Sequence, residues 1–498
     1  MSHRPIRRAL ALAAVAALAV AFPAQAAGPT PVQVTSSSPY YDSGCTADGV
    51  PQGSTNYPAT ELETHLAVNP TNPDNVVVAY QQDRYDNGGS RGDVVSVSDD
   101  GGQTWTQVRV QGIAQCDGGI WPRGTDPWLS FAPNGRLYLV SQSFDDPNYH
   151  QALVVATSVD GGHTWSTPVP VSDRLWGAPH YTYDDKVTLT ADPTDLTGKT
   201  AYLTWDRYSD GGSWYKDNNW WKDRFPFNGG YSSVWMSKTI DGGASWSQPA
   251  QIYRPGTNNY TTGPTISVLP DRSLVMSVAT WFQSKGGSSY TTYAMLRRST
   301  DGGKTWNNPV RGPRMNDSWP YDPVTSEWMR TGGGIAEVAV DRTSGALYLT
   351  WEDGGGSYYA GNALVSISAN AGRTWSAPVE VDGSSARAFT PMVAVAPDGT
   401  VGVSFGSFRR SGDETSQWIA TCSTGCTSSS SWTQVQVGGA QADGEFPMST
   451  APYARGLFLG DYSGFVADAN GFHAAYGLPN VDNSQIGTDI WYSSPGGG

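Results

Sequence analysis

The sequence predicts an all-β protein folded as a single β-propeller of four-stranded antiparallel blades, with seven blades favoured and six as the alternative. Three observations support this prediction: a turn phrase that occurs five times, a β-hairpin pattern that occurs seven times, and a composition rich in glycine and aromatic residues. The chain contains 58 glycines, 20 tryptophans and 25 tyrosines, while only 15% of its residues are charged. Self-similarity at intervals of tens of residues is typical of repeat architectures, and the β-propeller is one all-β form of them.

The repeated phrase has the pattern Ser/Thr-x-Asp/Asn-x-Gly-x-Ser/Thr-Trp. An Asp or Asn side chain can bond the backbone of its own tight turn, glycine adopts positive φ without steric cost, and tryptophan packs a large ring against a neighbouring sheet. We therefore interpret the phrase as a structural turn and not as a catalytic motif. Its five copies begin at Ser98, Ser158, Thr239, Ser299 and Ser368.

The hairpin pattern is a short apolar strand, a turn rich in Pro, Asp, Asn and Gly, and a second apolar strand. The seventh hairpin is followed by only one further strand, TDIWYSS, before the chain ends. We predict that the segment PVQVTSS near the mature N-terminus supplies the missing fourth strand, which closes the ring and removes an exposed sheet edge. A sixth, degraded copy of the turn phrase is predicted to end at Trp432. The seven hairpins begin at Leu66, Leu129, Val187, Ile266, Val338, Val393 and Phe465.

The turn phrase resembles the Asp-box, or BNR repeat, of sialidases and related secreted β-propellers. In that family the box joins the third and fourth strands of a blade, on the face opposite the active site. The resemblance covers nearly all of the mature chain and implies a sialidase-like exo-glycosidase that acts on an acidic glycan. Since Asp-boxes also occur in other proteins, two alternatives stay open: a polysaccharide lyase or hydrolase of uronate-containing glycans, and a non-catalytic glycan-binding propeller.

The first residues have the features of a secretory signal peptide. Three arginines precede an apolar run from Ala9 to Phe22, which the small-residue site Ala24-Gln25-Ala26 closes. We expect residues 1–27 to be removed and residues 28–498 to form one extracellular propeller domain. The apolar run is too short to span a membrane, so we expect no membrane partner.

Four cysteines in an exported chain predict two disulfides, with zinc as the less favoured alternative. Cys422 and Cys426 are close enough to clip one loop, which leaves Cys45 to pair with Cys116.

The formal charge of -14 argues against nucleic acid as a partner, because its phosphates require basic surfaces. We expect an acidic oligosaccharide or polysaccharide as the partner, a monomeric protein and no cofactor. Calcium at acidic pairs such as Asp99-Asp100 and Asp145-Asp146 is the one cofactor left open.

The loops on the face opposite the boxes carry most of the concentrated polar residues, and a ring of such loops converges on one funnel. A lining of arginines and carboxylates suits an anionic sugar, because arginine grips a carboxylate and paired acids transfer protons. The alternative for each residue alone is a salt bridge between blades or a turn cap. The loops include Glu61 to His65, Arg123 to Asp126, Tyr183 to Lys186 and Gly460 to Tyr462.

In sialidases three arginines hold the substrate carboxylate, a tyrosine assisted by a glutamate is the nucleophile, and an aspartate is the acid/base. The resemblance implies Asp126 as acid/base and Tyr462 as nucleophile, with Glu352 as a possible partner of Tyr462. The Phe/Tyr-Arg-Ile-Pro motif that supplies the first arginine of the family is missing, so the arginines do not transfer one by one. The candidates for binding the substrate carboxylate are Arg84, Arg123, Arg330 and Arg387, and we expect no metal ligand.

Overall fold

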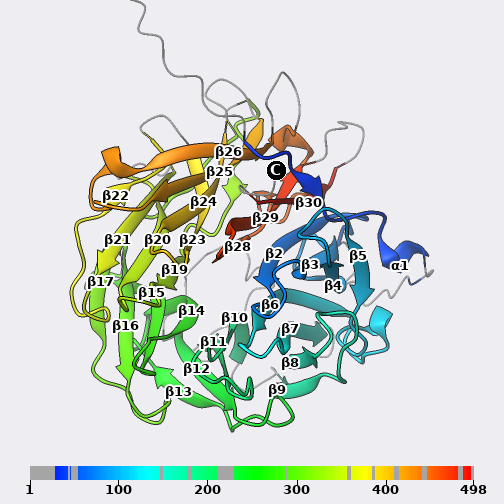
Figure 1. Cartoon of the computed structure of the whole chain (residues 1–498), viewed down its shortest axis with the longest axis horizontal. Helices are drawn as coiled ribbons and strands as arrows, with labels where there is room; N and C mark the ends of the chain where they lie inside the picture. Colours follow the sequence, from blue (N-terminus) through cyan, green and yellow to red (C-terminus); the bar gives the residue numbers. More distant parts are fainter. Residues whose placement is uncertain are drawn as a thin grey trace, which may run out of the picture.

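Seven groups of antiparallel strands surround one axis in the computed structural model (Figure 1). Six of these groups are consecutive along the chain, and the seventh combines three C-terminal strands with one N-terminal strand. The all-β propeller prediction is confirmed. Five of the sheets have four strands, and an eight-stranded sheet consists of two further four-stranded groups that are joined by the pairing of Ser90 with Gly124. The structure describes residues 28–42, 45, 54–145, 150–175, 182–209, 229–287, 289–322, 324–355, 361–383, 387–408, 414–439, 446–479 and 486–494.

The strands of each blade follow one another outward from the axis. Blade 1 consists of β2 (Glu61–Val68), β3 (Val76–Arg84), β4 (Ser90–Ser98) and β5 (Thr106–Arg109). Blade 2 consists of β6 (Arg123–Phe131), β7 (Leu137–Asp145), β8 (His150–Ser158) and β9 (Val169–Leu175). Blade 3 consists of β10 (Thr182–Ala191), β11 (Ala201–Ser209), β12 (Tyr231–Thr239) and β13 (Ala250–Tyr253). Blade 4 consists of β14 (Tyr260–Val268), β15 (Leu274–Gln283), β16 (Tyr290–Ser299) and β17 (Val310–Met315).

The remaining blades complete the ring. Blade 5 consists of β19 (Ala336–Val340), β20 (Leu347–Asp353), β21 (Asn362–Ser368) and β22 (Val379–Glu380). Blade 6 consists of β23 (Arg387–Val395), β24 (Val401–Phe408), β25 (Thr415–Cys422) and β26 (Thr433–Gly439). Blade 7 consists of β28 (Gly464–Asp468), β29 (Gly471–Pro479), β30 (Thr488–Ser493) and β1 (Val32–Gln33). The other described elements are α1 (Pro39–Asp42), η1 (Gln115–Asp117), β18 (Met329–Arg330), η3 (Ser429–Ser431), η4 (Met448–Thr450) and β27 (Leu457–Phe458).

The N-terminal strand closes the ring. Val32 pairs with Tyr492 of β30 in an antiparallel register, and the amide of Val34 donates to the carbonyl of Ile490 at 2.8 Å. In Figure 1 this dark blue strand lies beside the red C-terminal strands. The prediction that the segment PVQVTSS supplies the missing strand is confirmed.

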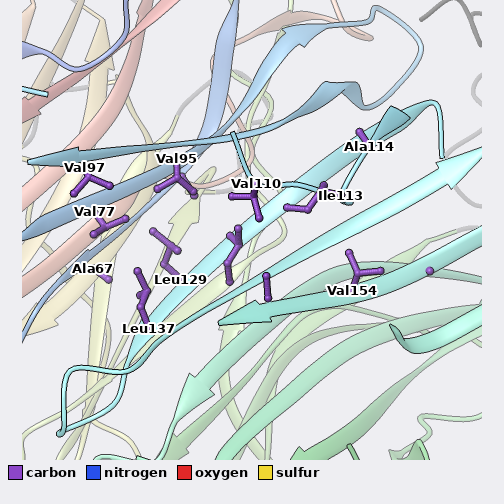
Figure 2. Packing of buried hydrophobic residues seen from close by; sticks show 14 of the residues in the cluster. Ala67, Val77, Val95, Val97, Val110, Ile113, Ala114, Leu129, Leu137 and Val154 are labelled. Atoms are coloured by element: carbon purple, nitrogen blue, oxygen red, sulfur yellow. The ribbon is translucent and has the colours of Figure 1, made fainter. Parts of the chain in front are cut away.

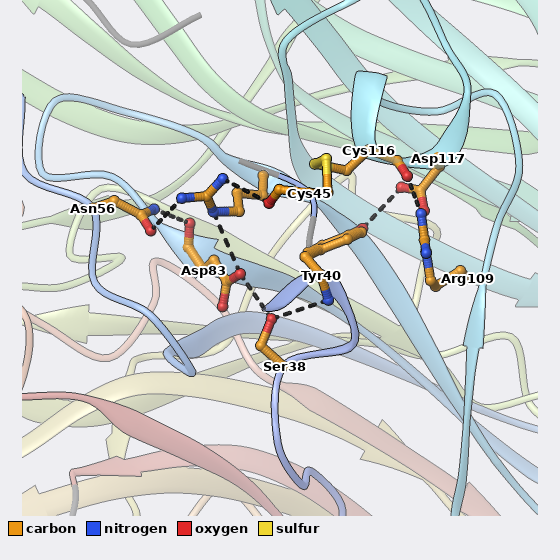
Figure 3. Close-up of a disulfide and its surroundings, with 9 residues drawn as sticks. Ser38, Tyr40, Cys45, Asn56, Asp83, Arg109, Cys116 and Asp117 are labelled. Carbon is orange, nitrogen blue, oxygen red and sulfur yellow. Dashed lines mark hydrogen bonds and ion pairs between the residues drawn. A yellow bond between two sulfur atoms is a disulfide. The ribbon is translucent and has the colours of Figure 1, made fainter. Parts of the chain in front are cut away.

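A second anchor ties the N-terminal segment to the blade 1 region, as Figure 3 shows. The Cys45–Cys116 disulfide forms as predicted. The Tyr40 hydroxyl donates to Asp117 Oδ2 at 2.8 Å, and the Ser38 hydroxyl donates to Asp83 Oδ2 at 2.8 Å. The segment is therefore held covalently and by buried hydrogen bonds.

The turn phrases join the third and fourth strands of their blades. In the second copy Asp160 Oδ1 accepts from the Ser158 hydroxyl at 2.7 Å and from the Thr164 amide at 2.9 Å. The indole of Trp165 donates to the carbonyl of Gly162 at 2.8 Å. These local bonds use up the hydrogen-bonding groups of the turn, as a structural role requires.

Blade 6 uses a different device at the same place. The predicted Cys422–Cys426 disulfide lies in the turn between β25 and β26, and the Trp432 indole donates to the carbonyl of Cys426 at 3.1 Å. The disulfide loop therefore replaces the degraded box.

The cores lie between neighbouring blades, where the apolar faces of two sheets meet. Figure 2 shows the cluster between blades 1 and 2, in which Val77 and Val95 of blade 1 pack near Leu129 and Leu137 of blade 2. All four are at most 1% exposed, and each such side chain contributes roughly 1.5–3 kcal/mol through burial. The predicted signal peptide lies outside the described residues. In the part of the chain that the structure describes, no helix is long and apolar enough to cross a membrane.

Candidate functional site

A β-bulge interrupts the inner strand of five blades at the same position, near the end of the strand opposite the boxes. In each bulge one residue has positive φ, although four of the five residues are not glycine. A bulge redirects a side chain, and strained backbone of this kind clusters at functional sites. The five residues are Glu63 (φ 52), Asp126 (φ 54), Lys186 (φ 50), Gly263 (φ 64) and Thr390 (φ 49).

Three of these bulges bring opposite charges together. Lys186 Nζ lies 3.6 Å from Glu63 Oε1 and 3.7 Å from Asp126 Oδ2. A third carboxylate, Asp461 Oδ2, accepts a hydrogen bond from the same ammonium at 2.7 Å. Burial alone would lower the pKa of Lys186, but the carboxylates of Asp126, Asp461 and Glu63 raise it well above its ordinary value. Lys186 therefore remains a cation that joins blades 1, 2 and 3 to the segment before blade 7.

Arg330 forms the second cationic contact of Asp461. Its Nε donates to Asp461 Oδ1 at 3.1 Å, and its Nη2 donates to Oδ2. Arg330 belongs to β18, which pairs in parallel with β27, and its guanidinium lies 4.0 Å from the ring centre of Phe458 in β27. Arg84 lies 5.4 Å from the same ring. Arg330 Nη1 is buried and has no hydrogen-bond partner among the described residues.

A cavity of about 240 Å³ opens beside this cluster. Its walls combine charged groups, aromatic rings and a stretch of bare backbone at Gly332, Gly333 and Gly334. Arg455 adds another guanidinium, and it adopts a left-handed backbone conformation with φ 65. The charged lining residues are Asp185, Lys186, Asp317, Arg330, Arg455 and Asp461, and the aromatic ones are Tyr208, Trp281 and Trp319.

The environment displaces the pKa values of two cavity carboxyls in opposite directions. Burial raises the pKa of Asp185, although Lys186 opposes the shift. Burial would also raise the pKa of Asp461, but Arg330 and Lys186 outweigh it and hold that pKa well below its ordinary value. A carboxyl with a raised pKa thus lies in the same cavity as a carboxyl with a lowered pKa, and a pair of pKa values displaced in opposite directions is typical of the acid/base pairs of many enzymes. Burial and the neighbouring Arg330 lower the pKa of Arg455 to about 9.

The structure brings three of the predicted site residues together. Arg84 and Arg330 share the Phe458 ring, and Asp126 lies beside Lys186. Arg330 lines the cavity, whereas Asp126 and Arg84 lie behind its wall. Arg84 Nη1 donates to Gln81 Oε1 at 2.7 Å, so its guanidinium is partly used within blade 1.

Tyr462 and Glu352 do not meet. The Tyr462 hydroxyl donates to the carbonyl of Pro127 at 3.3 Å, and its ring packs 5.5 Å from that of Trp128. Burial, together with Asp126, raises the pKa of Tyr462 well above its ordinary value. Glu352 instead accepts from Thr390 and from Thr331. The predicted partnership is not formed: Asp461 lines the cavity, whereas Tyr462 does not.

The two remaining arginines lie apart from the cluster. Arg123 lies 4.6 Å from the ring centre of Tyr85 and donates to Asn87 Oδ1 at 2.9 Å and to the carbonyl of Gly88 at 2.6 Å. Arg387 begins β23, is exposed and does not line the cavity. Both arginines are separated from Arg330, so the four arginines do not converge on one point.

The sequence analysis chose Asp126 and Tyr462 as catalytic candidates, whereas the acidic residues that line the cavity include Asp185 and Asp461. All four residues lie in the loops that the sequence analysis selected. It also missed Arg455. The sequence does contain a signal for the position of the bulges. Three of the five bulge residues precede a proline at the same place in their hairpins, at Pro127, Pro264 and Pro391.

Two of the residues considered for calcium, Asp99 and Asp100, take part in other interactions. Asp100 Oδ1 accepts the amides of its own turn, and Asp99 pairs with His163 at 2.9 Å. Asp146 lies outside the described residues. Within the described ranges no group of three or more His, Cys, Asp or Glu side chains is arranged to hold a metal ion.

The buried glutamates predict how stability depends on pH. Burial raises the pKa of Glu337 and Glu352 to about 7, and it does the same for Glu63 against the opposing charge of Lys186. The folded state therefore binds a proton on each of these carboxyls more tightly than the unfolded chain does. The resulting gain in the free energy of unfolding is fully present below about pH 4.5, and it is lost as the pH rises through about 7. Each of these carboxyls contributes roughly 3 kcal/mol at most to the free energy of unfolding.

The box carboxylates act in the opposite direction. Bonds from Thr104 lower the pKa of Asp100 to about 2, and bonds from Ser245 do the same for Asp241, so these turns lose stability in stronger acid. We expect the melting temperature to peak near pH 5 and to fall toward pH 8 in a calorimetric series. Glu352→Gln should flatten the fall, and a melting temperature that rises steadily from pH 5 to pH 8 would contradict the assignment.

Comparisons with solved structures find distant likenesses to several other proteins. An α-L-arabinanase of Penicillium chrysogenum shares 15% identity, covering 78% of this chain and 98% of that chain with a TM-score of 0.47. The intramolecular trans-sialidase of Ruminococcus gnavus shares 13% identity, with coverages of 75% and 94% and a TM-score of 0.44. An ulvan lyase shares 11% identity, with coverages of 76% and 78% and a TM-score of 0.44. No protein-family model and no curated protein sequence matches the chain. Likenesses this distant assign no function, which therefore has to come from the residues of the cavity.

Proposed function

We propose that the protein is a secreted glycoside hydrolase that cleaves an acidic glycan in the cavity lined by Asp185, Arg330 and Asp461. One observation carries the proposal: a carboxyl with a raised pKa, Asp185, and a carboxylate held ionised, Asp461, line one cavity together with guanidinium groups and aromatic rings. Glycosidic bonds are hydrolysed by such pairs of carboxyl groups through a transition state with positive charge on the sugar ring.

The cavity residues divide the work as follows. Asp185 donates its proton to the leaving oxygen as the glycosidic C–O bond breaks, and Asp461 stabilises the positive charge that develops on the sugar. A water molecule then adds to the anomeric carbon and returns a proton to Asp185, which completes the hydrolysis. Arg330 Nη1 and Arg455 bind the carboxylate of the substrate, since arginine forms strong charge-assisted bonds with carboxylates. The rings of Tyr208 and Trp281 provide apolar faces against which sugar rings pack.

A non-catalytic glycan-binding propeller is the second candidate, and one observation favours it. Both carboxylate oxygens of Asp461 are already bonded, by Lys186 and by Arg330, as in a structural salt bridge. A binding protein would need the aromatic and cationic walls but no free carboxylate.

Turnover assays separate these candidates. The secreted protein is incubated with a fluorogenic sialoside and with uronate polysaccharides, while reducing ends and the absorbance of unsaturated products are followed. Released fluorophore or new reducing ends without ultraviolet absorbance support hydrolysis, and we expect Asp185→Asn to abolish them. New absorbance would show a lyase instead. Binding of these glycans by calorimetry without any turnover would show the non-catalytic protein.

A further inference from the structure

Glu352 is fully buried behind the cavity and bonds three separate segments. Its Oε2 accepts from the amide of Thr390, in the bulge of blade 6, at 3.1 Å. Its Oε1 accepts from the Thr331 hydroxyl at 3.2 Å, and the Ser318 side chain bonds the same carboxyl. Thr331 and Ser318 both line the cavity, whereas Glu352 does not. One carboxyl therefore connects blades 5 and 6 to two parts of the cavity wall.

The wall that Glu352 supports is made of bare backbone at Gly332 to Gly334. A side chain at Gly332 would collide with the carbonyl of Asp461, and one at Gly334 would collide with the Trp281 ring. A Cβ at Gly333 would lie 3.1 Å from the Ser318 carbonyl and 3.5 Å from Glu352 Oε1. The wall thus runs from the charged end of the cavity to its aromatic end in close contact with both.

The amides of Gly333 and Gly334 have no acceptor among the residues that the structure describes. Both residues are partly exposed and line the cavity. Since backbone N–H groups in such places are almost always paired, water or a ligand has to satisfy them. Backbone free of side chains is also the form in which a chain approaches a ligand closely.

We propose that Thr331–Gly334 is a glycan-binding wall whose Gly333 and Gly334 amides donate to an oxygen substituent of the bound acidic sugar, and that Glu352 is the positioning residue that fixes this wall. The inference rests on the proposed function for its ligand. Glu352 acts on the ligand indirectly, by holding the wall in place. Its carboxyl is separated from the cavity by Thr331 and Gly333 and does not contact Tyr462.

The test compares Glu352→Ala and Glu352→Gln with Glu337→Ala. Glu337 is a matched control, because it is also a buried glutamate of blade 5 with a pKa raised to about 7, and none of its described bonds reaches the wall. Glutamine can still accept from Thr390 and bond Thr331, so Glu352→Gln should keep KM and kcat within about 3-fold of the wild type. Glu352→Ala should raise KM about 10-fold or more while kcat falls much less, because a displaced wall weakens binding.

Hydrogen exchange provides a readout that does not depend on turnover. In Glu352→Ala the amides of residues 331–335 should exchange faster than in the wild type and in Glu337→Ala. In the wild type, sialyllactose or tri-galacturonate should slow exchange in the same peptide. If Glu352→Ala fails to fold, Thr331→Val removes one of the bonds without leaving a large void, and it should raise KM about 3-fold and speed the same exchange.

Three results would overturn the inference. Equal exchange of residues 331–335 in Glu352→Ala and Glu337→Ala would show that Glu352 does not position the wall. A loss of kcat of about 1,000-fold in Glu352→Gln at unchanged KM would make Glu352 catalytic. Protection by bound glycan that excludes the wall peptide would remove the binding role. If the protein binds no glycan, the proposed function and the binding role fail together, and the exchange comparison still decides whether Glu352 positions the wall.

Discussion

Asp461→Asn is expected to lower kcat about 1,000-fold and, because it removes a shared partner of Arg330 and Lys186, to lower the melting temperature as well. The substitution keeps the shape of the side chain but removes the negative charge that lies closest to Arg330 and Lys186 in the cavity. Loss of one preorganised electrostatic contact to a transition state costs about 100- to 1,000-fold in rate. Steady-state kinetics on the glycan that the turnover assays identify, together with circular dichroism, measures the effect.

Asp160→Asn is the matched control for this experiment. Asp160 lies in a box, at the end of its blade opposite the cavity, and the fifth box carries asparagine at the equivalent position, Asn370, with similar turn bonds. Asp160→Asn should therefore keep full activity. If Asp461→Asn retained activity within about 3-fold of the wild type, the assignment of Asp461 would be wrong.

Lys186→Met is expected to cost about 3–5 kcal/mol of unfolding free energy or to prevent folding. The ammonium is the common partner of Asp461, Glu63 and Asp126, and removing one partner from a buried ionic cluster leaves uncompensated charge. Methionine has a similar length and fills the space, so the loss of unfolding free energy measures the effect of removing the positive charge. Urea or thermal unfolding measures it.

The loss in Lys186→Met should be smaller at pH 5 than at pH 8. Without the ammonium, which lowers the pKa of both Glu63 and Asp461, these two carboxyls protonate more readily, and protonation in mild acid relieves the repulsion within the cluster. Lys304→Met, which removes an exposed lysine from a box, is the control and should melt like the wild type. A Lys186→Met protein that melts like the wild type at both pH values would show that the cluster contributes nothing to stability.

The architecture followed from the sequence because its signals are local. The turn phrase fixes a hairpin through bonds within eight residues, and Asp160 and Trp165 make those bonds inside their own turn. The pairing of Cys45 with Cys116 followed from the short spacing of the other two cysteines. The closing N-terminal strand was predicted because the seventh hairpin is followed by only one further strand.

The site was less predictable from the sequence than the fold was, because part of its geometry depends on β-bulges in the inner strands. A one-residue bulge reverses which side chain faces the axis, and a sequence does not show where the extra residue lies. The loop that contains Asp461 and Tyr462 was selected from the sequence, but no repeat fixes which of the two side chains faces the cavity, and in the structure it is Asp461. Arg455 was missed because it reaches the cavity from a short connection before β27, outside every repeat.

The central claim is that the cavity lined by Asp185, Arg330 and Asp461 binds and cleaves an acidic glycan. A crystal structure of Asp185→Asn soaked with sialyllactose or with tri-galacturonate tests this claim most directly. Asp185→Asn removes the proposed proton donor and leaves the contacts among Asp461, Arg330 and Lys186 in place, so an intact substrate should accumulate. The account predicts a sugar in the cavity, with its carboxylate at Arg330 Nη1 and Arg455 and its glycosidic oxygen facing residue 185. Ordered sugar on another surface, with only water in the cavity, would contradict it.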